Sequence, residues 1–407
     1  MRLKYFLFLL LICFSCNRGR QTPMIETLVT FHQEPTIQGT FVYYPISNNR
    51  ITVNLNNPQE ASLFDYFSHI ELIPMETNDH VLIGRRVEEI VHSQNKFYVQ
   101  CSQRHRVFVF DNTGQFLFQI NRRGQGPGEY LHLRSIFLNP FTGNIDILCY
   151  QRILSYCSLT GEYVKTVNLS EISGHFFWNL IALDETTYVL FTRQRVGGDS
   201  YRIHFVDVGL GEVTHREYED DPFLNSFLFF AETAHTPFFW YNGNWYFYRF
   251  VDRVTYRVEA DGLVPAFTWD FGRHNFDAGN LPIANRREPT GITSLPWQIN
   301  NQGQSNRFVI MDIFLTQLTS PYGFVIIHDK AANEAKLIDR WTEGVRFLPR
   351  KITNEYVLAW AFHDMLDRYV TEDMLDDANR QRFINLMNAR DEENPIIIKY
   401  FFKQDGE

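Results

Sequence analysis

The sequence predicts an all-β protein, a six-bladed β-propeller, from three observations. Aromatic residues make up 16% of the 407 residues, including 37 Phe and 20 Tyr, which favours packed sheets over helical bundles. A turn containing Gly or Asn recurs five times, most often at intervals near fifty residues. Strand-like segments remain near the start and at the end of the chain, and together they can form a sixth blade.

The recurring turn has the same layout in its clearest copies. Asp-Asn-Thr-Gly, ending at Gly114, and Ser-Leu-Thr-Gly, ending at Gly161, lie 47 positions apart, and an aromatic–aliphatic pair follows each. Weaker copies lie at Gly211 and Gly262, 50 and 51 positions further on, and a fifth has Asn333 in place of Gly. Gly and Asn suit tight hairpin turns because these turns need positive φ angles.

Each turn follows two strand-like runs, and each unit has room for a leading strand. The predicted strands are 86–91, 96–101 and 106–110, then 134–138, 144–150 and 153–157, then 187–191 and 201–206, then 245–250 and 254–258, and finally 324–328. Four short strands per repeat are typical of a propeller blade that is packed on both faces. The fifth turn lies 71 positions after the fourth, and we expect the Gly-, Asn- and Pro-rich stretch 275–304 to be an inserted loop.

The sixth blade combines both ends of the chain. Runs 347–353, 355–361 and 395–403 supply three strands, and 69–75 supplies the fourth. Pairing the N- and C-terminal strands closes the ring and removes two exposed sheet edges. Between these runs lies a helical insert, 364–394, in which Thr371 caps a helix whose first turn carries Glu372 and Asp373. We expect this helix to pack on the propeller face, and an exposed partner-binding helix is the alternative.

The N-terminal segment predicts export. Arg2 and Lys4 precede an apolar run, 5–12, that is too short to span a membrane, which takes about 20 apolar residues. We therefore assign 1–15 as a signal peptide. Ser15-Cys16 resembles a lipobox, so Cys16 is the expected lipid attachment site. Residues 16–50 are expected to form a tether that contains a strand-like run at 41–44, and residues 51–407 are expected to form the propeller. Plain secretion with a free Cys16 is the alternative.

Three cysteines remain after Cys16. Cys101, Cys149 and Cys157 are too few for a disulfide framework and are best explained as buried apolar residues, although a bond between Cys149 and Cys157 stays open. The formal net charge of −9 argues against a nucleic-acid partner. We also expect a monomer.

Signatures of catalysis are missing from the sequence. It contains no His-Glu-x-x-His, no Gly-x-Ser-x-Gly and no phosphate-binding Gly-Lys-Ser/Thr motif. We therefore predict no cofactor and no metal, and we favour a protein without enzyme activity over an enzyme. His105 and His132 both fall near the rim, and a metal site there is kept as an alternative. The seven Trp residues are mostly in strand-like runs and are expected in the core, with Trp297 the best surface candidate.

Arginines gather in loops that a propeller would place on one face. Guanidinium groups bind carboxylate and phosphate in a bidentate manner, so these loops predict an anionic ligand at the channel mouth, such as a uronate-containing glycan or an acidic peptide. Pairing of these arginines with local acids such as Asp364 and Asp367 is the alternative. Glu129 joins the candidates, although it is better suited to accepting backbone hydrogen bonds. The candidate ligand-binding residues are Arg104, Arg106, Arg122, Arg123, Glu129, Arg152, Arg193, Arg195 and Arg253, with Arg286 and Arg287 in the expected loop insertion.

Several motifs together resemble a known family. They are Glu-Leu-Ile-Pro-Met-Glu-Thr at 71–77, Leu-Ile-Gly at 82–84, Gly-Gln-Gly-Pro-Gly-Glu-Tyr at 124–130 and Asn394-Pro395 before the last strand. This set resembles the six-bladed β-propeller lipoproteins of Bacteroides-type bacteria, which are related in architecture to NHL-repeat propellers. The resemblance implies export and lipid anchoring and implies no established activity. The third and fourth blades and the stretch near residue 290 depart from the pattern.

These observations favour a non-enzymatic envelope lipoprotein that binds a ligand or a protein. A propeller hydrolase or lyase acting on carbohydrate or peptide, and a scaffold for a membrane partner, are the alternatives. We expect the outer membrane and favour its periplasmic side, because residues 17–20, Asn-Arg-Gly-Arg, lack an acidic run that resembles a surface-export signal.

Overall fold

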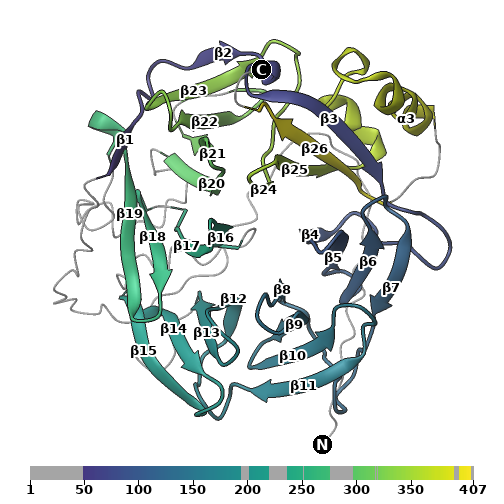
Figure 1. Cartoon of the computed structure of the whole chain (residues 1–407), viewed down its shortest axis with the longest axis vertical. Helices are drawn as coiled ribbons and strands as arrows, with labels where there is room; N and C mark the ends of the chain where they lie inside the picture. Colours follow the sequence, from purple (N-terminus) through teal and green to yellow (C-terminus); the bar gives the residue numbers. More distant parts are fainter. Residues whose placement is uncertain are drawn as a thin grey trace, which may run out of the picture. The chain divides into compact units, whose positions relative to one another are not determined.

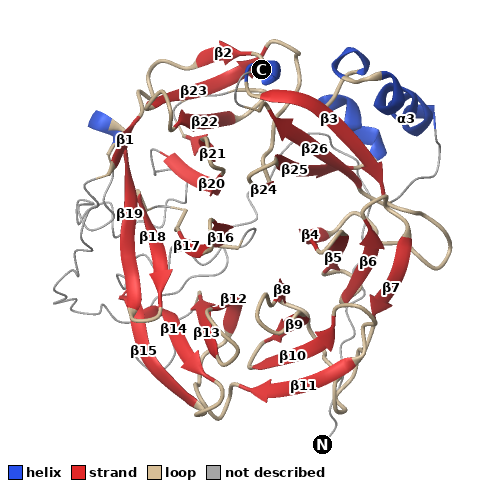
Figure 2. Ribbon diagram, in the orientation of Figure 1, coloured by secondary structure: helices blue, strands red, loops and turns tan. Residues whose placement is uncertain are grey.

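The computed structural model confirms the six-bladed propeller. It describes residues 49–193, 201–219, 236–250, 252–275, 297–316, 318, 320–388 and 394–404. Over these residues the strands form six sheets that follow one another around a ring (Figures 1 and 2). The expected signal peptide, Cys16, the strand-like run 41–44 and Arg195, Arg286 and Arg287 lie outside the described residues. No helix in the described ranges is long and apolar enough to cross a membrane.

The first three blades are regular four-stranded antiparallel sheets. Blade 1 consists of β4 (Val87–Ser93), β5 (Lys96–Cys101), β6 (Arg106–Asp111) and β7 (Phe116–Ile120). Blade 2 consists of β8 (Ser135–Leu138), β9 (Asn144–Cys149), β10 (Arg152–Cys157) and β11 (Tyr163–Asn168). Blade 3 consists of β12 (Phe177–Ala182), β13 (Thr187–Thr192), β14 (Tyr201–Asp207) and β15 (Glu212–Glu219).

The N-terminal strands contribute to the other three blades. Blade 4 consists of β16 (Phe238–Tyr241), β17 (Asn244–Phe247), β18 (Val254–Glu259) and β19 (Gly262–Asp270), with β1 (Arg50–Thr52) parallel to β19. Blade 5 consists of β20 (Trp297–Gln304), β21 (Phe308–Leu315), β22 (Phe324–Asp329) and β23 (Glu334–Trp341), with β2 (Gln59–Ala61) parallel to β23. Blade 6 consists of β24 (Lys351–Ile352), β25 (Tyr356–Ala361), β26 (Ile396–Phe402) and β3 (Phe67–Pro74).

Three local expectations are corrected by the structure. The stretch 275–304 ends in the innermost strand of blade 5, and Trp297 is fully buried there at 0% exposure. The strand resembles a loop in sequence because it is rich in Asn and Gln, two of which, Asn301 and Gln302, line the channel. The first strand of blade 6 is limited to Lys351–Ile352, and Phe347, expected to begin it, lies before the strand and packs in the core. Cys157 is half-buried, whereas Cys101 and Cys149 are buried, and all three are free thiols.

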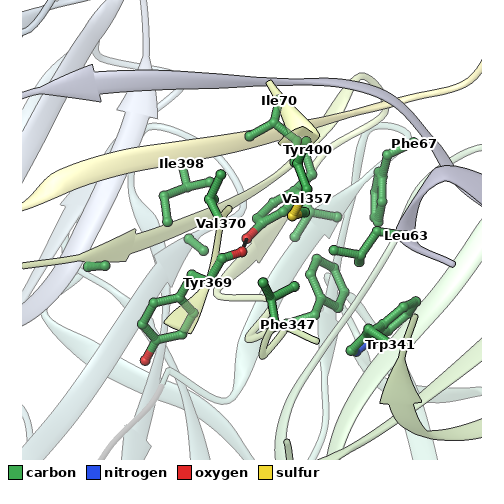
Figure 3. Packing of buried hydrophobic residues seen from close by; sticks show 14 of the residues in the cluster. Leu63, Phe67, Ile70, Trp341, Phe347, Val357, Tyr369, Val370, Ile398 and Tyr400 are labelled. Atoms are coloured by element: carbon green, nitrogen blue, oxygen red, sulfur yellow. Dashed lines mark hydrogen bonds between the residues drawn. The ribbon is translucent and has the colours of Figure 1, made fainter. Parts of the chain in front are cut away.

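Pairing between β3 and β26 closes the ring as predicted. The two strands are antiparallel, with Ile70 opposite Tyr400 and Ile73 opposite Ile397. Around this joint a buried cluster fills the space between blades 5 and 6 (Figure 3). Within it Tyr400 donates its phenol hydrogen to the carbonyl oxygen of Tyr369 at 3.1 Å. The closing blade is thus held by backbone pairing and by an apolar core.

The C-terminal insert differs from the predicted single helix. The insert begins with a 3-10 helix (His363–Arg368), and Thr371 then caps a second, short 3-10 helix (Glu372–Met374). The α-helix α3 (Asp377–Asn388) begins later, where the Asp376 carboxylate accepts the Asn379 N–H at 2.8 Å. Instead of a propeller face, α3 covers the outer edge of β3, where Asn379 Oδ1 accepts the Leu72 N–H at 3.0 Å and Arg382 donates to the Leu72 carbonyl at 3.2 Å. With β1 and β2 it protects the outer edges of blades 4 to 6.

Buried polar groups join neighbouring blades at fixed points. Asp146 on β9 accepts hydrogen bonds from Ser155 at 2.5 Å, from Asn139 at 2.9 Å and, across the blade boundary, from Tyr188 on β13 at 2.8 Å. Burial raises the pKa of the Asp146 carboxyl, and these three donors oppose that shift. Because Asp146 is 1% exposed, the three donors have no access to water as a substitute.

Replacing Asp146 should therefore weaken the joint between blades 2 and 3. Asp146→Ala removes the acceptor of three buried hydrogen bonds, and only the Asn139 amide retains another acceptor, the Tyr188 hydroxyl at 3.1 Å. We expect a loss of roughly 3–5 kcal/mol in the free energy of unfolding. Asp146→Asn retains one acceptor oxygen, and the Ser155 hydroxyl can rotate to accept from the new amide, so the loss should be clearly smaller. Urea unfolding of both variants checks this order, and equal losses would contradict it.

The joint between blades 1 and 6 should be sensitive to acid. His92 Nδ1 lies 2.5 Å from the Tyr356 hydroxyl, and burial, aided by Lys399, lowers the pKa of His92 from 6.5 to about 4. The unfolded chain thus binds more protons between these values, so His92 takes away stability as the pH falls from about 6.5 to about 4. The His92→Gln variant should lose less stability than the parent over this window in urea titrations at pH 7 and 4.5. The same loss in both would refute this role.

Candidate functional site

The innermost strands of the six blades surround a channel with two connected cavities. Figure 1 shows β4, β8, β12, β16, β20 and β24 around the centre. One cavity has a volume of about 260 Å³ and the other about 520 Å³. Both are lined by a set of residues that draws on all six blades, which we call the waist: Glu89, Ser135, Asn179, Thr236, Asn301, Arg350 and Lys351. The waist is polar because inner strands meet the channel rather than another sheet.

The smaller cavity is lined by arginines and tryptophans, and we call it the cationic cavity. Beyond the waist it is lined by Glu88, Gln100, Ser102, Leu133, Arg134, Trp178, Arg193 and Trp360. The guanidinium carbons of Arg134 and Arg193 each lie 4.3 Å from the Trp178 ring centroid, and Arg134 is also 4.6 Å from the centroid of Tyr150. These cation–π contacts place two positive charges against one indole ring.

The acidic residues of the cationic cavity are already engaged. Glu89 Oε1 accepts a hydrogen bond from Lys351 Nζ at 2.6 Å, which forms an ion pair, and Glu88 Oε1 accepts from Ser102 at 2.5 Å. Burial lowers the pKa of the Arg350 guanidinium, and the negative charge of Asp312 opposes that shift. Burial raises the pKa of Asp312 to about 6, although a hydrogen bond from Asn300 and neighbouring cations oppose the shift. Within the described residues no carboxylate lies within ion-pair distance of Arg134, so its charge is available to a ligand.

The predicted arginine set is only partly brought together. Arg193 lines the cationic cavity and is 5% exposed. Arg104, Arg122 and Arg123 are exposed on the connecting loops. Arg106 and Arg152 are half-buried, with Arg106 donating to Gln119 at 3.3 Å, and Arg253 is buried and donates to the Trp269 carbonyl at 3.1 Å.

Glu129 closes its own loop. Its Oε2 accepts the Gly126 N–H at 2.8 Å, and a Cβ at position 124 would lie 2.0 Å from the same oxygen. Gly128 has a φ angle of +68°, and its carbonyl accepts from the buried Tyr156 hydroxyl at 2.8 Å. The Gly-Pro-Gly-Glu-Tyr motif thus shapes the link between blades 1 and 2.

Sequence reasoning missed most of the residues that build the cationic cavity. Arg134, Arg350 and Lys351 were not among the candidates, nor were Trp178 and Trp360 as channel residues. A positional signal existed, since Arg134 directly precedes β8 and Arg350 directly precedes β24. Basic residues at the start of a leading strand, rather than arginines anywhere in the loops, identify the channel mouth.

The two rim histidines lie close together. The ring centroids of His105 and His132 are 5.4 Å apart, and burial lowers the pKa of His105, with the charges of His132 and Arg123 adding to the shift. A group of three or more metal-ligating side chains is not found in the part of the chain that the structure describes.

Solved structures with a similar fold come from Bacteroides species. A crystal structure from Bacteroides fragilis named "Putative exported protein" has a TM-score of 0.67 at 17% identity and covers 87% of this chain and 100% of its own. A member of the duf4221 family from Bacteroides vulgatus has a TM-score of 0.49 at 12% identity, covering 83% and 98%. The first likeness agrees with the propeller fold.

No curated protein matches this sequence. One family model does, over residues 48–401, which is nearly the whole propeller. The chain therefore belongs to the family described as "Domain of unknown function (DUF4934)".

Proposed function

We propose that this protein is an exported, non-enzymatic binding propeller that holds an anionic ligand in the cationic cavity. The observation that carries the proposal is the Arg134 guanidinium, which lies on Trp178 in a channel mouth and forms no ion pair within the described residues. A charge held in this way at a cavity wall is stabilised by the ring face and retains its hydrogen-bonding edge for a ligand.

The composition of the cavity supports an anion over a cation or a neutral ligand. Arg134, Arg193, Arg350 and Lys351 line it together with two glutamates, so cationic side chains outnumber the carboxylates of its lining. Guanidinium groups recognise carboxylates in bidentate geometry, and the Trp178 and Trp360 rings offer flat surfaces beside them. A uronate-containing glycan or an acidic peptide meets both requirements.

The engaged glutamates favour binding over hydrolysis. A glycosidase needs one carboxyl group to donate a proton and another to act as nucleophile or base. Glu89 is paired with Lys351, and Glu88 accepts a hydrogen bond from Ser102, so each is committed to a neighbouring side chain.

We further propose that the protein is lipid-anchored through Cys16 on the periplasmic side of the outer membrane. The short apolar run after Arg2 and Lys4 and the Ser15-Cys16 pair support this assignment. The name of the Bacteroides fragilis relative, which describes an exported protein, supports export.

Arg134→Ala should weaken ligand binding without unfolding the propeller. We expect saturable, salt-sensitive binding of an oligogalacturonate or an oligoglutamate peptide to the parent, and binding weaker by about tenfold or more in the variant, because a charged hydrogen bond contributes about 1.5–3 kcal/mol. Arg123→Ala, at an exposed loop position, is the matched control and should bind like the parent. Calorimetric titration at two salt concentrations measures both effects. Failure of both probes to bind, or equal affinities of the two variants, would overturn the proposal.

Cys16→Ala should abolish acylation. In a bacterial host that lipidates exported proteins, palmitate labelling is expected for the full-length parent and not for the variant, which should move from the membrane fraction to the soluble fraction. Cys101→Ala serves as the control, since that thiol is buried in the propeller. Labelling of the Cys16 variant would place the anchor elsewhere.

A further inference from the structure

One hairpin of blade 4 is unusually aromatic. β16 and β17, with the two-residue turn between them, read Phe-Phe-Trp-Tyr-Asn-Gly-Asn-Trp-Tyr-Phe. Asn242 and Gly243 have positive φ angles of 48° and 76°, which fits the tight hairpin turn that an Asn-Gly pair favours. This turn places Trp240 opposite Trp245, with ring centroids 4.9 Å apart.

These rings form one wall of the larger channel cavity, which we call the aromatic cavity. It is lined by Phe239, Trp240, Tyr241 and Trp245 from the hairpin and by Phe137 from blade 2, whose ring lies 5.6 Å from Trp245. Trp240 is 44% exposed, although most large aromatic side chains of this protein are buried. An exposed indole at the mouth of a cavity of about 520 Å³ offers a flat surface to a ligand.

The rest of the aromatic cavity is polar but nearly neutral. Exposed Asn242 and Asn354 lie at its rim. At the waist, Ser135 Oγ and Asn179 Oδ1 are buried without a hydrogen-bond partner among the described residues, and so is Trp245 Nε1 deeper in the wall. An unpaired buried polar group is destabilising, and a polar ligand would offset that cost by pairing with it.

Charges of both signs reach the aromatic cavity. Glu89 and Lys351 form an ion pair, and the negative charge of Asp312 opposes the lowering of the Arg350 pKa that burial causes. His92 is uncharged at neutral pH because burial lowers its pKa to about 4. The cavity therefore differs from the cationic cavity on the other side of the waist, which is also lined by Arg134 and Arg193.

We infer that the aromatic cavity is a second binding site, which takes a neutral oligosaccharide. A sugar ring has a face of C–H groups that packs on Trp240 and an edge of hydroxyls that pairs with amides and with unpaired polar groups at the waist. An acyl chain or an apolar peptide side chain would pack on the rings but would leave Ser135 and Asn179 unpaired. The combination of one aromatic wall with a neutral polar remainder therefore favours a saccharide.

The inference is distinct from the proposed anion site, although the waist residues Ser135 and Asn179 line both cavities. Its other residues come from the hairpin of blade 4 and from the rim around it, and Trp240 and Arg134 each line only one of the two cavities. Loss of anion binding in Arg134→Ala would thus leave neutral saccharide binding unchanged, and the reverse holds for Trp240 variants.

Fluorescence titration with neutral oligosaccharides tests the inference. The probes are β-1,4-, β-1,3-, α-1,4- and α-1,6-linked hexose oligomers of four to six units, added to the full-length protein. We expect one linkage class to change the tryptophan emission in a saturable, salt-independent manner. Trp240→Ala should weaken that binding tenfold or more, and Trp240→Phe, which retains a ring face, should remain within about threefold of the parent when measured by calorimetry.

Phe314→Ala is the matched control, because Phe314 is 48% exposed on β21 and does not line either cavity. It should bind like the parent. The inference is overturned if none of the four oligomer classes binds, if Trp240→Ala binds as tightly as Phe314→Ala, or if a fatty acid or an apolar peptide binds at Trp240 in place of the saccharides.

Discussion

The structure depends on the antiparallel pairing of β3 with β26. A ring of sheets has two free ends wherever the chain starts and stops, and here one strand from each end completes the same blade. Ile70 opposite Tyr400 sets the register, and the apolar cluster around Phe67 and Phe347 fixes it because a slip by one residue would turn buried side chains outward. The N-terminal strands β1 and β2 and the helix α3 then cover the outer edges next to this joint.

Closure also determines the chemistry of the channel. The innermost strand of each blade has no further strand on its inner side, so its side chains meet a polar, water-accessible space and include amides and charges such as Asn179, Asn301 and Lys351. The loops at one end of this space bring Arg134 and Arg193 onto Trp178 in the cationic cavity. The hairpin of blade 4 brings Trp240 to the aromatic cavity at the other end of the space. Two cavities of different character thus share one waist, and the fold needs no additional domain to provide them.

The number of blades and the closure of the ring were predicted better from the sequence than the residues that line the channel. The turns at Gly114 and Gly161 and the apolar strands before them repeat because every blade needs them, so blade number and closure could be read directly. Trp297 was wrongly predicted at the surface because its strand is rich in amides that line the channel. The predicted start of the α-helix was too early because Thr371 caps a short 3-10 helix instead. Of the channel arginines only Arg193 was among the candidates. Arg134, Arg193 and Arg350 converge from three blades, and the loops were chosen by their arginine content rather than by position before a leading strand.

The most direct test of this account is the crystal structure of the protein with an oligogalacturonate. The account predicts density for a carboxylate within hydrogen-bond distance of the Arg134 guanidinium, with a sugar ring beside Trp178 or Trp360 in the cationic cavity. Density on the outer loops at Arg122 and Arg123, with the cavity free of ligand, would contradict it and would assign the binding surface to the loops.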